Sequence, residues 1–232
     1  MIRCQNQHEN PDDAQFCLKC QLPLKGQEPP KKTADVVFCF DTTGSMGGEI
    51  DDLKASAVMF AQELNSHGVH FQVGLVEFRD LKHPEPPGYH QLAVVAPLSE
   101  NAVEFHNAVQ SLRASGGGDE PESSLDAIRE ALNLQGYRGG TVRKYIVLVT
   151  DASPNEPDHS GKTVDQLVQE FAQDAQARLM LVVPDQVPAY QRIKSSLGSR
   201  AELLPIVAAG KRADFQQILD RVVQGTAVIA GV

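Results

Sequence analysis

Near its start the chain reads Val36-Val37-Phe38-Cys39-Phe40-Asp41, an apolar run that ends in a carboxylate. A strand that is apolar on both of its faces is typical of the centre of a parallel sheet with helices on both sides. A second run of this kind extends from Tyr145 to Thr150 and is followed by Asp151. The two runs predict neighbouring buried strands, each of which leads into an aspartate.

Outward from these strands, apolar runs alternate with helical patterns, as is typical of α/β domains. Apolar residues recur at helical spacing from Ile50 to Leu64, directly after the first strand. The pattern predicts a doubly wound, Rossmann-like α/β fold, with helices on both faces of a mostly parallel six-stranded sheet. We expect the short strand at 89–95 to be antiparallel and to lie at an edge. Further strands are expected at 71–78, 179–183 and 202–207, and further helices at 101–113, 122–134, 163–176, 188–197 and 211–224.

The composition excludes several classes of function. The chain has 232 residues, with 21 Lys or Arg against 30 Asp or Glu and a net charge of −9. This charge repels phosphate backbones and anionic lipids, so we expect no nucleic-acid or membrane partner. No apolar run approaches the ~18 residues of a membrane span, and the first residues lack the apolar core of a signal peptide. We therefore expect a cytoplasmic protein.

Cysteines are concentrated at the start of the chain, at Cys4, Cys17 and Cys20. The Cys-x-x-Cys spacing of the last two resembles one half of a zinc ribbon, whereas Gln7 stands where the other half would have its second cysteine. His8 is the obvious substitute. The candidate Zn²⁺ ligands are therefore Cys4, His8, Cys17 and Cys20, and the open alternative is a degenerate ribbon that binds no metal.

These features divide the chain into four parts. A zinc-ribbon-like module at residues 1–24 is followed by a proline-containing linker at 25–34, the α/β domain at 35–225 and an apolar tail at 226–232. The tail either packs back on the domain or binds a partner.

Side chains with oxygen atoms follow both buried strands. Asp41, Thr43 and Ser45 stand at alternate positions, so all three can point into the same crevice. Asp151 follows the neighbouring strand, and a glycine-rich loop at 115–122 adds further carboxylates. Hard oxygen donors of this kind suit Mg²⁺. The sequence therefore predicts a magnesium site where the carboxyl ends of the strands meet.

The same residues resemble the metal-ion-dependent adhesion site of von Willebrand factor A domains. That site is written Asp-x-Ser-x-Ser, followed by a loop threonine and then an aspartate. Asp41, Thr43 and Ser45 match the first element, with threonine in place of the first serine, and Asp151 matches the last. The resemblance covers about residues 34–225.

The loop threonine has no counterpart in this chain. The glycine-rich loop offers Asp119 and Glu120 instead, and Asp119 is the candidate fifth ligand. Carboxylates at positions 41, 119 and 151 would then surround one divalent ion. Such a site holds the metal more tightly but attracts an acidic partner less, unless Asp151 acts through water.

The resemblance implies a function as well as a fold. It implies a non-enzymatic intracellular adaptor or scaffold, in which Mg²⁺, or Mn²⁺ or Ca²⁺ in its place, binds an acidic residue of a partner protein. Cytoplasmic domains of this family often act beside AAA-type ATPases, kinases or phosphatases, so such systems are the expected partners.

Three alternatives compete with this interpretation. The hydroxyl residues after Asp41 could merely cap the following helix. The segment from Asp41 to Ser45 is also close to the Asp-x-Asp-Gly-Thr motif of haloacid-dehalogenase-like phosphatases, with Asp41 as nucleophile, although Thr43 cannot act as the general acid. In the third alternative, the fold persists with a vestigial or purely structural metal site.

Asp80, after the second strand, is expected to be a turn residue or part of a loop ion pair.

Overall fold

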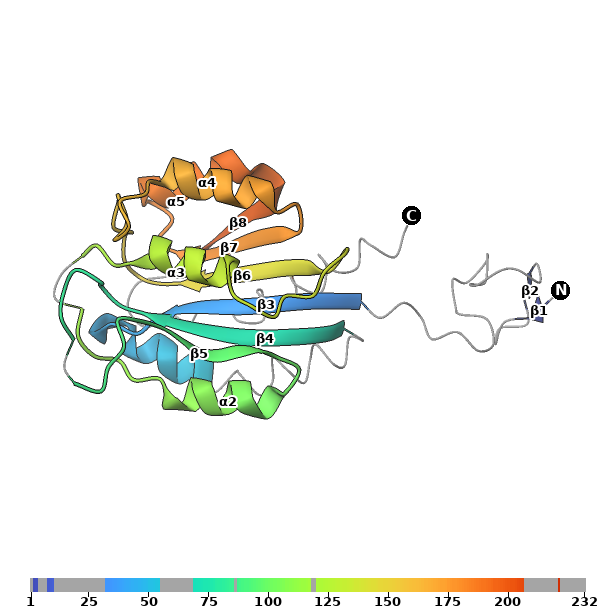
Figure 1. The fold of residues 1–232 in the computed structure, drawn as a ribbon, viewed down its shortest axis with the longest axis horizontal. Helices are drawn as coiled ribbons and strands as arrows, with labels where there is room; N and C mark the ends of the chain where they lie inside the picture. Colours follow the sequence, from blue (N-terminus) through green and yellow to red (C-terminus); the bar gives the residue numbers. More distant parts are fainter. Residues whose placement is uncertain are drawn as a thin grey trace.

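A computed structural model describes residues 2–3, 8–10, 32–54, 69–85, 87–117, 120–206 and 221. Its main element is a six-stranded sheet with strand order β5-β4-β3-β6-β7-β8 (Figure 1). All neighbours in this sheet are parallel except β4 and β5. The α/β fold with one antiparallel edge strand is therefore confirmed. The strands are β3 (Lys32–Asp41), β4 (Val69–Phe78), β5 (Leu92–Ser99), β6 (Arg143–Val149), β7 (Ala177–Val183) and β8 (Ala201–Pro205).

The central strand β3 is buried on both faces. Phe38 and Phe40 belong to the apolar cluster on one side of the sheet, and Val37 and Cys39 belong to the cluster on the other side. Because successive side chains of a strand point to opposite faces, an uninterrupted apolar run fits a strand with helices on both sides.

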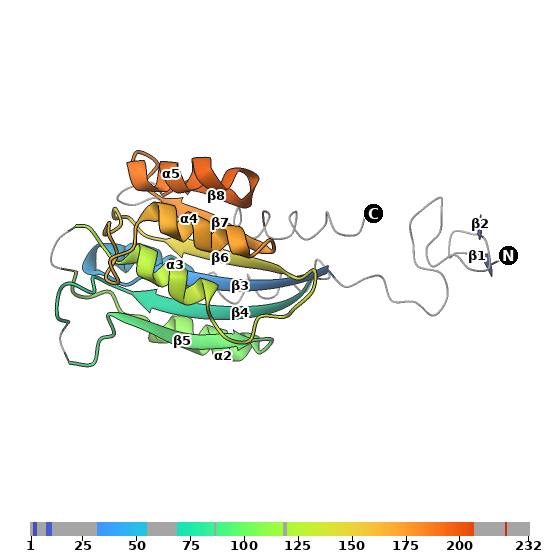
Figure 2. The same ribbon diagram turned by 45° about the horizontal axis from the view of Figure 1, so that its top comes forward.

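Helices cover both faces, as expected (Figures 1 and 2). The helical segment 47–54 and α2 (Ala102–Ser111) contribute Ile50, Leu53, Phe105 and Val109 to the first cluster. On the opposite face lie α3 (Ser124–Leu132), α4 (Val164–Gln173) and α5 (Pro188–Leu197). Short 3-10 turns complete the domain at η1 (Gly44–Met46) and η2 (Gly198–Arg200).

The edge strand differs from the expectation in its extent. β5 has eight residues, more than β6, β7 or β8, and it continues beyond Val95. Pro97 interrupts the apolar pattern but is compatible with an edge strand, where a missing N–H need not weaken a ladder. The register shifts on both sides of Leu75, and a Cβ atom on Gly74 would lie 3.3 Å from the Ala96 carbonyl oxygen. Glycine therefore permits the close approach of β4 and β5 at this irregularity.

Several sequence predictions fall outside the described residues. They concern most of the helix that begins near Ile50 and is expected to end near Gly68, most of the helix at 211–224 and the tail at 226–232. Near the amino terminus, β1 (Ile2–Arg3) and β2 (Glu9–Asn10) form an antiparallel pair. Among the described helices, none has the length and apolar character needed to cross a bilayer.

Candidate functional site

Asp41 is completely buried at the carboxyl end of β3. Its Oδ1 accepts hydrogen bonds from the Thr43 backbone N–H at 2.9 Å and from the Thr43 hydroxyl at 2.7 Å. Its Oδ2 accepts a hydrogen bond from the Thr150 hydroxyl at 2.5 Å. Asp41 therefore fixes the two hydroxyl groups that flank it.

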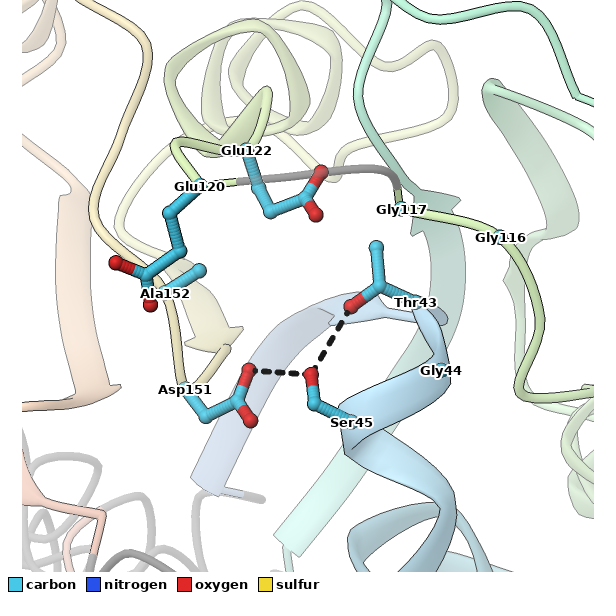
Figure 3. A pocket seen from close by; sticks show the side chains of 9 residues that line it. All are labelled: Thr43, Gly44, Ser45, Gly116, Gly117, Glu120, Glu122, Asp151 and Ala152. Carbon is cyan, nitrogen blue, oxygen red and sulfur yellow. Dashed lines mark hydrogen bonds between the residues drawn. The ribbon is translucent and has the colours of Figure 1, made fainter.

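Ser45 and Asp151 contact each other at the same end of the sheet. The Ser45 hydroxyl donates to Asp151 Oδ1 at 3.1 Å, and the hydroxyl oxygens of Thr43 and Ser45 are 3.5 Å apart (Figure 3). Because β3 and β6 are parallel neighbours, the residues that follow them share one edge of the sheet. The structure thus brings together four of the five predicted ligands: Asp41, Thr43, Ser45 and Asp151.

Helix capping does not account for this arrangement. Thr43 precedes η1 in the N-cap position, but its side chain makes no capping hydrogen bond. Its hydroxyl donates to Asp41 instead. The polar side chains are thus directed toward one another across the loops rather than toward the backbone of the helix that follows.

Glu122 is the site residue that sequence reasoning did not select. It forms a parallel β-bridge with Pro154, its N–H donates to the Ser153 carbonyl at 2.9 Å, and its side chain lines the same pocket as Thr43 and Asp151. Asp119, the residue chosen from the sequence, lies outside the described residues. The sequence of the glycine-rich loop indicated that carboxylates lie near the site. The bridge to Pro154, which places Glu122 at the pocket, is visible only in the structure.

The pocket is a hollow of about 260 Å³ between three loops: the β3 loop, which follows β3 and contains Thr43 to Ser45, the glycine-rich loop, and the β6 loop, which follows β6 and contains Asp151 and Ala152. Gly117 lies at its wall with a φ of 84°, and a Cβ atom there would lie 2.7 Å from Thr43 Cβ and 3.0 Å from Glu122 Oε1. Only glycine fits so close to both side chains. The lining residues are Thr43, Gly44, Ser45, Gly116, Gly117, Glu120, Glu122, Asp151 and Ala152 (Figure 3).

The electrostatics of the pocket favour a cation. Burial raises the pKa of Asp41 to about 6, although its hydrogen bonds to Thr150 and Thr43 act in the opposite direction. Burial also raises the pKa of Glu122 to about 8, and the nearby negative charges, that of Asp41 foremost, add to this rise. Glu122 is 4% exposed, and its Oε2 atom has no hydrogen-bond partner among the described residues. A buried carboxylate oxygen without a donor is costly unless a cation or proton satisfies it.

The donor set fits a hard divalent cation. Within the described part of the chain, no three His, Cys, Asp or Glu side chains cluster closely enough to form a metal site by themselves. The hydroxyl oxygens of Thr43 and Ser45 lie in the same pocket and offer further hard donors. Carboxylates combined with hydroxyls suit Mg²⁺ or Ca²⁺ rather than a softer metal.

Asp80 has the structural role expected of it. It is buried, it lies 2.5 Å from His83 Nδ1, and its Oδ1 accepts a hydrogen bond from the Asn155 amide at 2.9 Å. Its Oδ1 also accepts a hydrogen bond from the Lys82 N–H at 3.0 Å, so Asp80 is a turn residue, one of the two roles expected from the sequence.

The zinc ligands cannot be assembled from the described residues. Cys4, Cys17 and Cys20 lie outside them, whereas His8 precedes β2 and its carbonyl accepts a hydrogen bond from Asn10. The zinc site therefore stays a prediction.

Comparison with known proteins identifies the domain. A profile described as the von Willebrand factor A domain matches residues 35–205. The chain belongs to this family. In this von Willebrand factor A domain, the motif of Asp41, Thr43 and Ser45 lies at the carboxyl end of β3. Membership of the family supports a role in protein interaction.

The chain spans only a small part of the length of the curated relatives that it matches. Integrin beta-4 of Mus musculus is 31% identical over 117 residues, which cover 44% of this chain and 6% of the integrin. The von Willebrand factor A domain-containing protein 7 of Mus musculus is 26% identical over 199 residues, which cover 84% of this chain and 20% of that protein. Among solved structures, the three N-terminal domains of the type V pili tip protein Mfa5 from Porphyromonas gingivalis align with a TM-score of 0.39 and 20% identity, covering 51% of this chain and 20% of that one.

Proposed function

We propose that this chain is a Mg²⁺-dependent protein-interaction module. In this proposal Thr43, Ser45, Glu122 and Asp151 hold the cation, Asp41 orients the hydroxyls, and Asp119 remains a further candidate ligand. The observation that carries the proposal is the buried Oε2 atom of Glu122, which has no hydrogen-bond partner among the described residues and lies in the pocket that Thr43, Ser45 and Asp151 also line. The bound ion would present a positive charge to an acidic side chain of a partner protein.

The hydrogen bonds of Asp41 affect how many carboxylates contact the bound ion. Its two oxygens already accept three hydrogen bonds, from Thr43 and Thr150. Asp41 is thus suited to orient the hydroxyl ligands from behind, as carboxylates that hydrogen-bond to metal ligands commonly do. Fewer carboxylates then contact the ion directly, and it keeps more attraction for an acidic partner.

The geometry also argues against a phosphohydrolase. A nucleophilic Asp41 would need an oxygen exposed to the substrate. The residue is instead fully buried, with both oxygens engaged by Thr43 and Thr150. We therefore propose a non-enzymatic adaptor or scaffold in the cytoplasm, and AAA-type ATPases, kinases or phosphatases are the partner systems that we propose for it.

Capture of a partner tests this function. We expect the immobilised chain to retain a partner from an extract of its own cells in Mg²⁺ and to release it when a chelator is added. Replacing Ser45 with alanine removes one hydroxyl ligand and should reduce retention about tenfold or more. The matched control is Ser160→Ala, since that exposed hydroxyl bonds only to Asp158 among the described residues.

Two results would contradict the proposal. One is equal retention by the native chain and the Ser45→Ala variant. The other is Mg²⁺-dependent hydrolysis of phosphate esters that disappears in Asp41→Asn, which would favour the haloacid-dehalogenase-like mechanism.

For the amino-terminal module we propose a structural Zn²⁺ site made by Cys4, His8, Cys17 and Cys20. Elemental analysis of the purified protein should find about one zinc per chain, since structural zinc takes four such ligands. We expect the zinc content to fall in Cys17→Ser and to be retained in Gln7→Ala. Absence of zinc from the native chain would mean that the module is a degenerate ribbon.

A further inference from the structure

Arg79 is a buried arginine at the carboxyl end of β4, with a side chain 1% exposed. Its Nε donates to the carbonyl oxygens of Thr42 at 3.1 Å and Ser115 at 3.0 Å. Its Nη2 donates to the Arg113 carbonyl at 2.8 Å, and its Nη1 donates to the His90 carbonyl. One guanidinium therefore satisfies backbone carbonyls from three separate loops.

An aromatic ring and a carboxylate also lie close to the Arg79 guanidinium. The ring of Tyr89 lies 5.1 Å from the Arg79 Cζ atom, and the buried Glu77 carboxylate lies 3.8 Å from Nη1. Removing a guanidinium from water is costly unless its donors are satisfied. Here carbonyls, an aromatic face and a carboxylate compensate the charge, so the loops are arranged around Arg79.

The first loop held in this way carries candidate metal ligands. Thr42 is the residue between Asp41 and Thr43, and its carbonyl accepts hydrogen bonds from both Arg79 and the Ser115 N–H, the latter at 3.0 Å. A shift of this carbonyl rotates the peptide group between Thr42 and Thr43. It would therefore move Thr43 relative to the glycine-rich loop.

The other side of the pocket is held through the backbone of the same residue. The Arg79 carbonyl accepts a hydrogen bond from the Ser123 N–H at 3.3 Å, and Ser123 directly follows Glu122. The Gly44 N–H donates to the Gly116 carbonyl at 3.2 Å and closes the contact between the first two loops. Arg79 thus joins the β3 loop, the glycine-rich loop and the segment that presents Glu122.

We propose that Arg79 is a positioning residue that holds these loops at the spacing a small cation needs, and that it thereby sets the preference of the site for Mg²⁺ over Ca²⁺. This inference rests on the proposed function. Mg²⁺ requires near-ideal octahedral geometry at about 2.0–2.1 Å, whereas Ca²⁺ accepts irregular geometry at about 2.3–2.6 Å. Loosening the loops therefore weakens Mg²⁺ binding more than Ca²⁺ binding.

The test is calorimetric titration of the full chain and its Arg79→Lys variant with Mg²⁺ and, separately, with Ca²⁺. Lysine keeps the charge but cannot reach four carbonyls from one planar group. We expect the Kd for Mg²⁺ to rise about 10–100-fold and the Kd for Ca²⁺ to change much less. The ratio of the Mg²⁺ Kd to the Ca²⁺ Kd should therefore increase.

The matched control is Arg138→Lys. Arg138 donates to the Asp35 carboxylate at 2.7 Å and to the Ala34 carbonyl at 2.7 Å, at the opposite end of β3 from Asp41. This variant should lose thermal stability while the ratio of the Mg²⁺ and Ca²⁺ affinities stays unchanged. The ratio therefore separates positioning of the site from general loss of stability.

A second variant covers the case in which Arg79→Lys does not fold. Tyr89→Ala removes the aromatic cover of the guanidinium and leaves Arg79 in place, so we expect a shift of the ratio in the same direction by a few-fold. An unchanged ratio in each variant that folds would overturn the inference. If the native chain itself binds neither ion, the proposed function fails, and that result is distinct from failure of the role of Arg79.

Discussion

The Asp41→Ala variant should lose the stabilisation that Mg²⁺ gives the native chain. Asp41 orients the Thr43 hydroxyl and the Thr43 N–H, and it also accepts the hydrogen bond of Thr150. Without this carboxylate, Thr43 has no fixed orientation toward the pocket. A ligand at about 100 times its Kd stabilises a protein by about 2.7 kcal/mol, which for a domain of this size raises Tm by about 5–10 °C. Thermal unfolding with increasing Mg²⁺ measures this difference.

Asp165→Ala is the matched control for this experiment. Asp165 is an exposed aspartate in the first turn of α4, and it is not among the residues that line the pocket. The control should keep the full response to Mg²⁺. If Asp41→Ala also keeps it, Mg²⁺ binds without the orienting role proposed for Asp41. A native chain that shows no response to Mg²⁺ would instead mean that the metal site is vestigial and that the interaction uses another surface.

The strands that carry the site could be predicted because their burial is encoded locally. An apolar run such as 36–40 fits only a strand covered on both faces, and a second run at 145–150 has to pair beside it. Parallel pairing then brings Asp41 and Asp151 to the same edge of the sheet, as β3 and β6 do. Thr43 and Ser45 follow from the alternation of side chains along an extended segment.

Glu122 could not be selected in this way because its position depends on contacts between loops. Its bridge to Pro154 joins segments more than thirty residues apart, and neither segment has a periodic pattern. The role of Arg79 could not be predicted from the sequence for a related reason. Its partners are backbone carbonyls such as that of Thr42, and any residue type supplies a carbonyl, so the sequence contains no sign of them.

The affinity of the site for Mg²⁺ should rise with pH until about pH 8. The pKa of Glu122 is raised to about 8, chiefly by burial and next by the charge of Asp41. Below that value the metal-free protein holds a proton on Glu122, and the cation must displace it. Affinity should therefore increase up to about tenfold per pH unit between about pH 6 and pH 8 and then level off, since one proton is released per ion bound. Calorimetric titration at several pH values measures this slope.

The stability of the metal-free protein should change in the opposite direction. Because the folded pKa of Glu122 lies above its ordinary value of 4.5, the folded state binds the proton more tightly than the unfolded state does. This contribution to the free energy of unfolding is complete below about pH 4.5 and is lost as the pH rises through about 8. Metal-free protein should thus become less stable over the range in which Mg²⁺ binds more tightly.

Glu122→Gln separates this carboxylate from every other titrating group. The variant should bind Mg²⁺ more weakly at pH 8 and should lose the steep part of the pH dependence, because glutamine has no proton to release. Glu130→Gln, an exposed position on α3 outside the pocket, should behave as the native chain does. If Glu122→Gln keeps the native slope, another carboxylate receives the cation, and Asp119 becomes the next residue to replace. In that case the burial of Glu122 Oε2, which has no hydrogen-bond partner within the described part of the chain, is a property of the fold alone.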